Sequence, residues 1–394
     1  MLTPYEIFWL FGIPAAVFSW YHIARHAFRY VPPARELPSG PIPNVVFSIA
    51  ARRLAPIVSQ SVDSIKTSCA AVGFSNYSIK VVVDEIGSGP IQGVETIVVP
   101  ADFTIQSRFK ARALHYALRF LPDDKNTWVL HLDEDALVTP QCVSSIVNYI
   151  MKGGKPIANG PSVFPYDGNV FTFLAEAQRH WTFYWLRDQL ETSAVHWLNG
   201  SNLLIRTDIE HQIGWDFPNC FISEDSRFAY ESSKKLHSAF GWHGGLTVET
   251  PPASIQAVLK QRMRWFYGSI LNLRYVPRAR LPRRIYSIAV WTNGLILTLF
   301  FFVLVLGVYH EPWFSHLFIV HGFTATSLFW IGRYQIGIYQ NLRFGKLSVG
   351  KRALLHLVGI PLVPVIDLLC TLPTVLGLII RPKSFQITAK RIAA

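Results

Sequence analysis

Three acidic side chains follow an apolar run in the stretch from Trp128 to Pro140 and are the first candidates for chemistry. Side chains two residues apart leave a strand on the same face, so Asp133 and Asp135 are expected to point together while Glu134 points away. Two converging carboxylates suit a hard divalent cation such as Mg²⁺ or Mn²⁺, which often bridges protein oxygens to the phosphates of a substrate. A solvated turn is the alternative that this short motif leaves open by itself.

Two later stretches carry side chains that suit the same chemistry. Glu224 and Asp225 stand at the expected start of a helix, where acids also commonly serve only as caps. In the run QRMRW, the side chains of Gln261, Arg264 and Trp265 share one helical face at spacings i, i+3 and i+4. An amide, a fixed cation and a flat ring together suit a diphosphate and an adjacent sugar.

A glycine between polar residues gives a further candidate. Gly200 precedes the apolar strand expected toward the end of His196 to Arg206. A missing side chain lets the backbone approach a ligand closely, and a plain turn is the open alternative.

The elements that must position these residues alternate between strand and helix. Strands are predicted at residues 44–51, 78–84, 94–99 and 156–159, and helices at 56–68, 107–120 and 143–151. This alternation predicts an α/β fold with a mostly parallel sheet and helices on both faces. Ligands bind at the carboxyl ends of such strands, where Asp84 and Asp133 are both expected, and the pair favours a site for a nucleotide and a metal.

Composition separates a polar middle from apolar ends. Hydrophobic residues make up 50% of the 394 residues, the mean hydropathy is +0.26, and the surplus falls in the first twenty residues and beyond Ile285. The chain is therefore expected to be an integral membrane protein with one globular domain. Much of the formal charge of +12 flanks the apolar spans, which favours a cytoplasmic domain beside anionic lipid and excludes nucleic-acid binding. Four cysteines without disulfide or metal-ligand spacing agree with a reducing compartment.

The expected order of segments follows from these signals. It comprises a membrane anchor at 1–30, a proline-rich linker at 31–43, the globular α/β domain at 44–253, an amphipathic interfacial region at 254–284, membrane helices at 285–380 and a cytoplasmic tail at 381–394.

Two expectations concern the parts of the chain nearest the membrane. The helix from Ser254 to Arg274 is expected to lie along the membrane surface, with an apolar side made by Leu259, Met263, Phe266 and Ile270. Residues 353–380 could cross the membrane once. A broken or re-entrant segment is favoured instead, because Pro361, Pro364, Asp367 and Pro373 interrupt the apolar run and the charge distribution would keep the tail cytoplasmic.

The order of the motifs resembles that of family 2 glycosyltransferases with the GT-A fold, whose core is a Rossmann-like sheet. Within that family the chain is most similar to the egghead-type β-1,4-mannosyltransferases, over roughly residues 44–274. The residues that carry the resemblance are Asp84, Lys110 within KARALHYAL, Asp133 and Asp135 within WVLHLDED, Glu224 and Asp225 within SEDSRFAY, and QRMRW at 261–265. Arg112 stands where many relatives have Gly or Asn, as it does in the egghead group. The C-terminal SFQITAK at 384–390 is similar to a segment of cellulose synthases.

The resemblance implies an inverting, metal-dependent transfer of a sugar, best matched by mannose from GDP-mannose in a β-1,4 linkage, onto a lipid-linked or oligosaccharide acceptor. It also implies a role for each residue, as follows. The nucleotide-sugar donor would contact Ala50, Ala51, Asp84, Lys110, Asp133, Gln261, Arg264 and Trp265. The metal, Mg²⁺ or Mn²⁺, would bind Asp133 and Asp135. The acceptor would lie by Gly200, Ser201 and Trp242, and Asp225 would act as catalytic base beside Glu224.

Two other function classes remain open at this point. A processive polysaccharide synthase of the same family would use the same chemistry with another nucleotide sugar. A basic membrane protein without enzymatic activity would use its acids as helix caps and place the QRMRW helix on the membrane surface.

Overall fold

The computed structural model describes most of the chain between Leu37 and Arg381. The described residues are 17, 20, 21, 24, 25, 37–85, 91, 93–236, 238–289, 291–292 and 331–381. Most of the predicted anchor at 1–30, residues 31–36 of the linker, residues 293–330 of the predicted membrane helices and the SFQITAK tail lie outside these residues.

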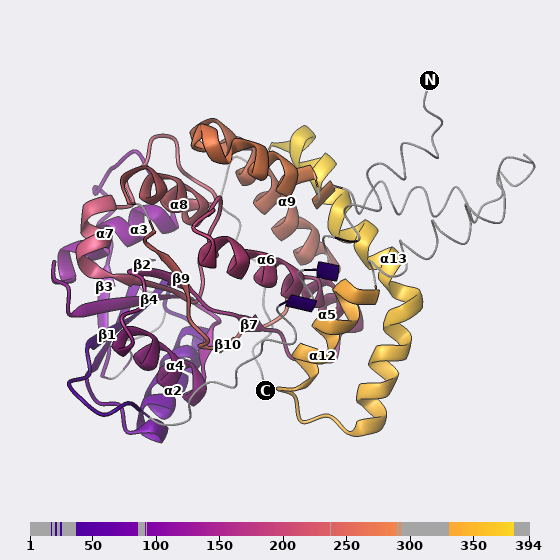
Figure 1. The fold of residues 1–394 in the computed structure, drawn as a ribbon, viewed down its shortest axis with the longest axis horizontal. Coiled ribbons are helices and arrows are strands. Elements are labelled where there is room, and N and C mark those ends of the chain that lie inside the picture. Colours follow the sequence, from indigo (N-terminus) through magenta and orange to yellow (C-terminus); the bar gives the residue numbers. More distant parts are fainter. Residues whose placement is uncertain are drawn as a thin grey trace, which may run out of the picture.

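A seven-stranded mixed sheet forms one side of the molecule, as Figure 1 shows. Its strand order is β3-β2-β1-β4-β8-β6-β9. Its strands are β1 (Asn44–Arg53), β2 (Tyr77–Glu85), β3 (Glu95–Val98), β4 (Thr127–Asp133), β6 (Ile157–Asn159), β8 (Leu203–Arg206) and β9 (Phe240–Trp242). Only β8 runs antiparallel to its two neighbours. The predicted α/β fold with a mostly parallel sheet is therefore confirmed.

A second, three-stranded sheet supports the edge where the acids emerge. It contains β5 (Leu137–Val138), β7 (Ser162–Val163) and β10 (Thr247–Val248), in the order β5-β10-β7. Because β5 follows the acids of β4 within a few residues, this small sheet fixes the chain on the far side of the turn that carries them.

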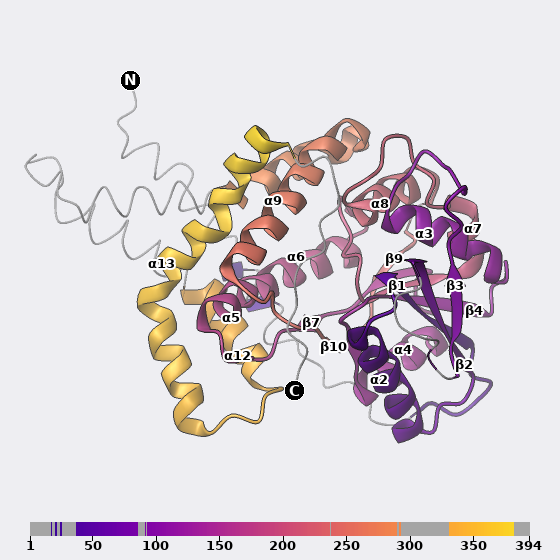
Figure 2. The same ribbon diagram turned by 180° about the vertical axis from the view of Figure 1, so that it is seen from behind.

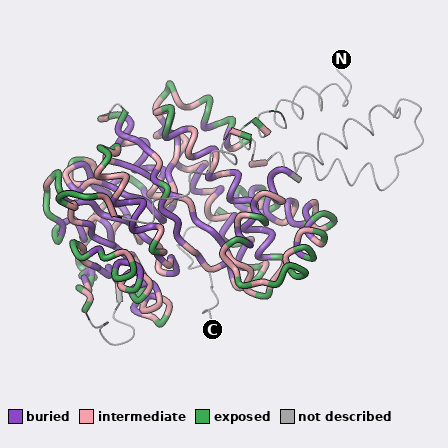
Figure 3. Tube along the Cα trace, turned by 60° about the horizontal axis from the view of Figure 1, so that its bottom comes forward, coloured by how far each residue is buried: buried purple, intermediate pink, exposed green. Residues whose placement is uncertain are grey.

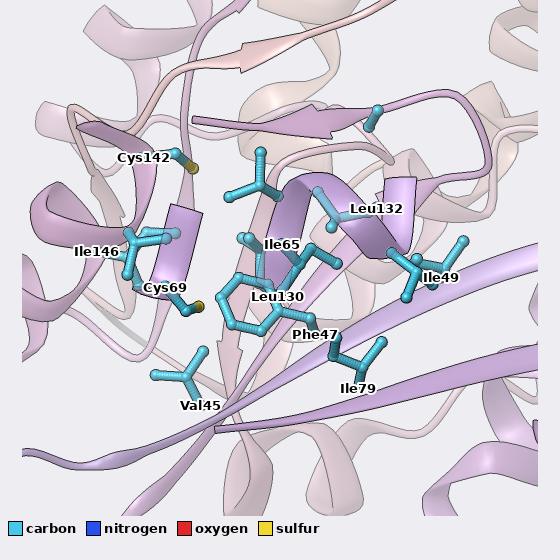
Figure 4. Packing of buried hydrophobic residues seen from close by; sticks show 14 of the residues in the cluster. Val45, Phe47, Ile49, Ile65, Cys69, Ile79, Leu130, Leu132, Cys142 and Ile146 are labelled. Carbon is cyan, nitrogen blue, oxygen red and sulfur yellow. The ribbon is translucent and has the colours of Figure 1, made fainter. Parts of the chain in front are cut away.

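Alternate side chains of the central strands enter two different cores, as the period of two in a strand requires. Helices α2 (Pro56–Val72) and α4 (Pro140–Met151) cover one face, where they pack on Phe47, Ile49 and Leu130 (Figure 4). The other face packs on α3 (Lys110–Ala117), the short helix η1 (Leu118–Phe120), α6 (Arg179–Glu191), α7 (Thr207–Ile213) and α8 (Glu224–Lys235). The strands therefore have little freedom to slip in register.

The remaining helices form a third apolar cluster beside the sheet (Figures 1 and 2). They are α5 (Val170–Ala177), α9 (Ile255–Leu271), α12 (Ile336–Leu342) and α13 (Val349–Ile380), joined by the short helices η2 (Asn272–Tyr275), η3 (Arg278–Arg280) and η4 (Ile331–Gln335). Figure 3 shows the buried residues continuing from the sheet into these helices, with exposed residues on their outer sides.

Part of the apolar side of α9 contacts protein, while Leu259 and Ile270 are half-buried, so the expected position along a membrane surface stays a prediction. Phe266 is 3% exposed and packs edge-on against Trp291 at 5.7 Å between ring centroids. Met263 lies against Gly377 of α13, because a β-carbon added there would be 3.3 Å from the Met263 Cγ. The apolar spacing was thus a real packing signal whose partner is a helix far along the sequence.

The break expected at the prolines is not observed, because Val349–Ile380 forms one continuous helix, α13. The expected re-entry and the cytoplasmic position of the tail stay predictions. The three internal prolines of α13 are Pro361, Pro364 and Pro373. Packing along α9 offsets the backbone hydrogen bonds that the prolines remove. The buried Asp367 is accommodated because it accepts hydrogen bonds from the Tyr334 hydroxyl at 2.8 Å and the Gln178 amide at 3.1 Å.

In the described part of the chain, α13 is the one helix long and apolar enough to cross a membrane. Its outer side carries exposed apolar residues such as Leu357 and Ile379, which are 65% and 71% exposed.

Candidate active site

A cleft of about 610 Å³ opens at the carboxyl ends of β1, β2 and β4, where ligands bind in open α/β sheets. Helices α3, α6, α8 and α9 close it on the other side. Its lining includes most of the residues singled out in the sequence, namely Ala50, Ala51, Asp84, Lys110, Asp133, Asp135, Gly200, Glu224, Asp225, Gln261, Arg264 and Trp265. One cavity therefore gathers side chains that are spread over more than 200 residues of sequence.

The two acids of the DED run emerge where β4 ends. The Asp133 side chain is 44% exposed and its Oδ1 lies 2.5 Å from the Lys110 ammonium. Asp135 is buried, and its Oδ2 accepts a hydrogen bond from the Thr250 backbone at 3.2 Å. Both carboxylates line the cleft, but Glu134, which was expected to point away, lines it as well. The strand periodicity does not extend to these residues, because β4 ends at Asp133 and the next two residues form a turn.

These carboxylates fit a hard divalent cation that shares its coordination with a substrate. Both supply oxygen, the ligand type that Mg²⁺ and Mn²⁺ prefer. Among the described residues, no group of three or more His, Cys, Asp or Glu side chains is placed to hold a metal alone. The two acids would thus need ligands from phosphate or water, which is usual for Mg²⁺.

Lys110 lies at the first turn of α3 and forms an ion pair with Asp133. Its ammonium donates to the Gly200 carbonyl at 3.0 Å and lies 4.0 Å from Glu224. Burial opposes the charge, but Asp133, Glu224 and Asp225 outweigh it and raise the pKa of Lys110. The lysine therefore stays charged throughout the physiological pH range.

Asp225, in the first turn of α8, has an unusual protonation equilibrium for a carboxylic acid. Burial, with a further contribution from the neighbouring Glu224, raises its pKa to about 7, although the Ser226 N–H and Lys110 oppose the shift. Ser226 donates its backbone N–H to the Asp225 Oδ1 at 2.6 Å, which fixes the carboxylate plane. A carboxylate with a pKa near the working pH is suited to accept a proton during a reaction.

Gly200 permits the close approach of backbone to these two charged groups. A β-carbon at this position would lie 3.3 Å from the Asp225 Oδ2 and 3.4 Å from the Lys110 Nζ. The functional interpretation of this glycine therefore gains support over that of a plain turn. Ser201, the next residue, is buried behind the cleft, and its hydroxyl accepts from the Asp133 backbone N–H at 3.4 Å.

Residues of non-glycine type adopt left-handed φ values at several points next to the site. Phe109, immediately before Lys110, has φ 55°, and Ser223, immediately before Glu224, has φ 57°. Asn202, two residues after Gly200, has φ 54°. Such conformations cost free energy and occur preferentially at functional sites, where surrounding structure holds them. No sequence signal marked these positions.

The QRMRW helix presents Gln261, Arg264 and Trp265 to the cleft, as their spacing predicts. Gln261 is 6% exposed, and its Oε1 has no hydrogen-bond partner within the described structure. Burial lowers the pKa of Arg264, although Glu224, Asp133 and Asp225 oppose this effect, and a guanidinium still remains charged at any physiological pH. The wall thus offers a buried acceptor and a fixed cation to a ligand.

Trp265 is held by two arginines that the sequence reading did not assign. The guanidinium carbons of Arg262 and Arg179 lie 4.5 Å and 5.1 Å from its ring centroid. Both arginines bind the same carboxylate, Glu176, at 2.9 Å and 3.0 Å, and Arg179 also reaches Glu249 at 3.4 Å. Arg262 is therefore buried inside the protein, which removes the alternative in which this helix only lies on a membrane surface.

Arg112 holds Asp84 and the loop after β3 in place through hydrogen bonds from its guanidinium group. Its Nη1 donates to the Asp84 Oδ1 at 2.7 Å, and its Nε donates to the Phe103 carbonyl at 2.8 Å. A third bond, from Nη2 to the Pro100 carbonyl, anchors the loop after β3. Arg112 thus orients the acid expected to contact the nucleoside.

Three differences separate the observed cleft from the expected one. Ser201, expected to contact the acceptor, is buried and does not line the cleft. Trp242 ends the edge strand β9, where it packs on the second core and does not line the cleft. The cleft instead extends toward aromatic and basic residues that the sequence reading did not single out: Trp181, Trp185, Trp197, Arg284, Ser287, Trp291 and Arg333. For the tryptophans among them, the one indication in the sequence was the high tryptophan content of the chain.

Comparison with known proteins identifies the protein family of this chain. Residues 128–331 match the model of the family described as Glycosyl transferase family group 2, and this chain belongs to that family.

Two curated relatives are β-1,4-mannosyltransferases. The chain is 27% identical over 256 residues to "Beta-1,4-mannosyltransferase bre-3" of Caenorhabditis elegans, covering 60% of this chain and 55% of the relative. It is 27% identical over 217 residues to "Beta-1,4-mannosyltransferase egh" of Drosophila melanogaster, covering 52% and 47%. The chain thus spans about half the length of these relatives. The expected resemblance to the egghead group is confirmed.

The fold has a counterpart among solved structures. A mannosyltransferase from Pyrobaculum calidifontis, solved in complex with GDP-Man and Mn²⁺, superposes with a TM-score of 0.50 over 92% of this chain and 95% of its own. The sequence identity is 13%, so the similarity concerns the fold alone, and it confirms the predicted GT-A fold.

Proposed function

We propose that this protein is an inverting, metal-dependent hexosyltransferase that transfers mannose from GDP-mannose to a hydroxyl of a lipid-linked or oligosaccharide acceptor, forming a β-1,4 linkage. The observation that carries the proposal is a single cleft that combines an acid with a pKa of about 7, a pair of metal-type carboxylates and two fixed cations. The names of the relatives support the choice of mannose and of the linkage.

The donor would bind with its base over the ends of β1 and β2. Ala50 and Ala51 leave room for a flat ring, and Asp84, oriented by Arg112, faces the same space. Asp133 and Asp135 would hold a Mg²⁺ or Mn²⁺ ion, which when bound supplies positive charge against the donor phosphates. Lys110 and Arg264 add two cations to the lining of the same cleft.

The reaction requires the transfer of one proton and the exchange of one bond at the anomeric carbon. Asp225 accepts the proton of the acceptor hydroxyl while the hydroxyl oxygen forms the new bond to that carbon. The bond to the diphosphate oxygen breaks with its electron pair, and Lys110 and Arg264 stabilise the charge that develops on that oxygen. Attack from the face opposite the leaving group inverts the configuration.

The protein would work at the cytoplasmic face of a membrane. The length and apolar outer side of α13 support attachment, and the basic residues near the apolar segments support this orientation. An acceptor carried by a lipid would then meet the cleft without leaving the bilayer surface.

A donor-release assay with the purified full chain tests the proposal. GDP-mannose, UDP-glucose and UDP-N-acetylglucosamine are offered in turn, each with Mg²⁺ or Mn²⁺ and with a chelator, and the released nucleoside diphosphate is measured. We expect release from GDP-mannose only with a divalent cation. Release of UDP at equal or higher rates would reject the assigned donor, and release unaffected by the chelator would reject the role of Asp133 and Asp135. Asp63→Asn, an exposed change on α2, serves as the matched control for variants of the cleft acids.

A further inference from the structure

The end of the cleft beyond Trp265 contains polar groups that the proposed transfer does not use. We call this region the tryptophan–arginine end; it is lined by Trp181, Trp185, Arg284, Ser287, Trp291 and Arg333. Four of these side chains, Trp181, Trp185, Arg284 and Arg333, are at most 7% exposed. They come from α6, from residues 281–292 and from η4, so the region is built by segments far apart in the sequence.

Arg284 is a buried cation whose charge has no counterpart among the residues that the structure describes. Its side chain belongs to a residue that is 5% exposed, and within the described structure it forms no ion pair and its Nε has no hydrogen-bond partner. A buried charge is costly unless an opposite charge and hydrogen bonds compensate it. Such an arginine is therefore expected to bind an anion that the described part of the chain does not supply.

A second unsatisfied donor lines the same region. The indole Nε1 of Trp181, a residue that is 3% exposed, also lacks a hydrogen-bond partner in the described part of the chain. Its ring is fixed by Trp185 at 5.2 Å between centroids and by the guanidinium of Arg333 at 5.2 Å. An indole N–H only donates, so both unsatisfied groups require an acceptor.

The neighbouring titratable groups do not neutralise Arg284. Burial, followed by Arg284 itself, lowers the pKa of His196 to about 3, so this histidine is neutral. Burial raises the pKa of Tyr230, which keeps its hydroxyl protonated. Arg333 forms an ion pair with Asp367 of α13 at 3.6 Å, so this carboxylate has a cationic partner other than Arg284. The local field is therefore positive.

We infer that the tryptophan–arginine end binds the phosphate ester of a lipid-linked acceptor, with Arg284 and the Trp181 indole donating to the phosphate oxygens. The inference rests on the proposed function, because it names the acceptor class for the same cleft. The phosphate is a recognition group here, and a separate hydroxyl of the acceptor remains the nucleophile.

Asp225 and the tryptophan–arginine end line one cleft, so a single acceptor can contact both. Residues Ile285 and Tyr286, directly after Arg284, are 52% and 40% exposed apolar side chains, so a lipid chain could continue over an apolar surface.

Ligand binding to the full chain in detergent micelles tests this inference. Intrinsic tryptophan fluorescence is titrated with farnesyl phosphate, farnesol and inorganic phosphate, since indoles line the region. We expect farnesyl phosphate to bind at least about 10-fold more tightly than either of the other two, because charge-assisted hydrogen bonds require the phosphate and the apolar surface requires the chain. Equal binding of farnesol would overturn the anion site, and equal binding of inorganic phosphate would overturn the lipid-linked class.

Variants of single residues locate the site. Arg284→Gln should weaken farnesyl phosphate binding by about 10- to 100-fold, whereas the exposed neighbour Arg283→Gln should leave it unchanged. Trp181→Phe keeps a ring and removes only the N–H, so it should weaken binding by about 3- to 10-fold. Unchanged farnesyl phosphate binding in both Arg284→Gln and Trp181→Phe would overturn the proposed phosphate site. If Arg284→Gln does not fold, the binding measured with Trp181→Phe tests the site.

A parallel titration with GDP-mannose and Mn²⁺ separates the two proposals. We expect Arg284→Gln to bind this donor as the unmodified protein does. Loss of farnesyl phosphate binding with intact donor binding supports the inference. If the unmodified protein binds farnesyl phosphate but no nucleotide sugar, the proposed function fails while the phosphate site stands. If it binds GDP-mannose but not farnesyl phosphate, only the inference fails.

Discussion

Replacement of the proposed base, Asp225→Asn, separates the catalytic requirement for this carboxylate from its effect on stability. The amide has nearly the same shape, and its oxygen still accepts the Ser226 N–H that now lies 2.6 Å from Oδ1. It cannot accept a proton from an acceptor hydroxyl. We therefore expect turnover to fall by at least about 100-fold, since a general base typically supplies 10² to 10⁴. Donor binding should remain nearly unchanged.

The same substitution should stabilise the folded protein at high pH. Burial raises the pKa of Asp225 from an ordinary value near 4 to about 7, so the folded protein resists ionisation of this group. A difference of this size corresponds to at most about 4 kcal/mol at 1.36 kcal/mol per pKa unit, and water in the cleft reduces it. We expect Asp225→Asn to gain about 1 to 3 kcal/mol in free energy of unfolding at pH 8.

The sign of this effect follows from the direction of the shift. Below pH 4 the acid is protonated in both states, so its replacement changes stability little. As pH rises from about 4 to 7, the unfolded chain releases the proton first, and the folded state loses stability relative to the amide variant. The turnover of the unmodified protein should rise over the upper part of this range, because only the ionised carboxylate accepts a proton.

Two measurements on the same preparations check this reasoning. Chemical denaturation at pH 4 and pH 8 gives the stability difference, and single-turnover transfer with saturating acceptor gives the rate. Asp63→Asn, exposed on α2, controls for the substitution itself. Turnover within about tenfold of the unmodified protein would refute the role of base. A variant less stable than the unmodified protein at pH 8 would refute the raised pKa.

Three further substitutions test other parts of the cleft. Asp135→Ala should weaken donor binding by about tenfold or more in the presence of Mn²⁺, with little effect in the presence of a chelator. Isothermal titration calorimetry measures both affinities, and an equal loss of affinity in the two conditions would contradict the metal-binding role of Asp135. Gly200→Ala places a methyl group 3.3 Å from the Asp225 carboxylate, so turnover should fall by about tenfold while thermal stability changes little; unchanged kinetics would show that the close approach is unimportant. Arg112→Lys loses the guanidinium hydrogen bonds that orient Asp84, so donor affinity should fall by about tenfold. Arg278→Lys, at an exposed position, is the control, and equal donor affinities of the two variants would contradict the orienting role of Arg112.

Local patterns predicted those parts of the site that single elements position. The run from Trp128 to Leu132 predicts a buried strand, and the acids after it must then stand at its carboxyl end. The spacing of Gln261, Arg264 and Trp265 likewise predicts their common face, because helical periodicity alone determines it.

Contacts between distant elements were not predictable in this way. Arg179 and Arg262 meet at Glu176 although 83 residues separate the two arginines, and no local spacing relates them. The apolar row of α9 predicts a buried side but does not say whether lipid or α13 covers it. The prolines of α13 predicted a break because their low helix propensity is visible in the sequence, whereas the packing of α13 on neighbouring helices, which outweighs it, is not.

The ion pair between Lys110 and Asp133 makes metal binding and donor binding interdependent. A divalent cation at Asp133 competes with a tethered ammonium that already neutralises this carboxylate, so part of its binding free energy is spent on separating the pair. Donor phosphates relieve that competition, because they give the displaced ammonium a new anionic partner. Each ligand should therefore raise the affinity for the other by the same factor, as thermodynamic reciprocity requires, and without a donor the lysine keeps this carboxylate from binding cations tightly.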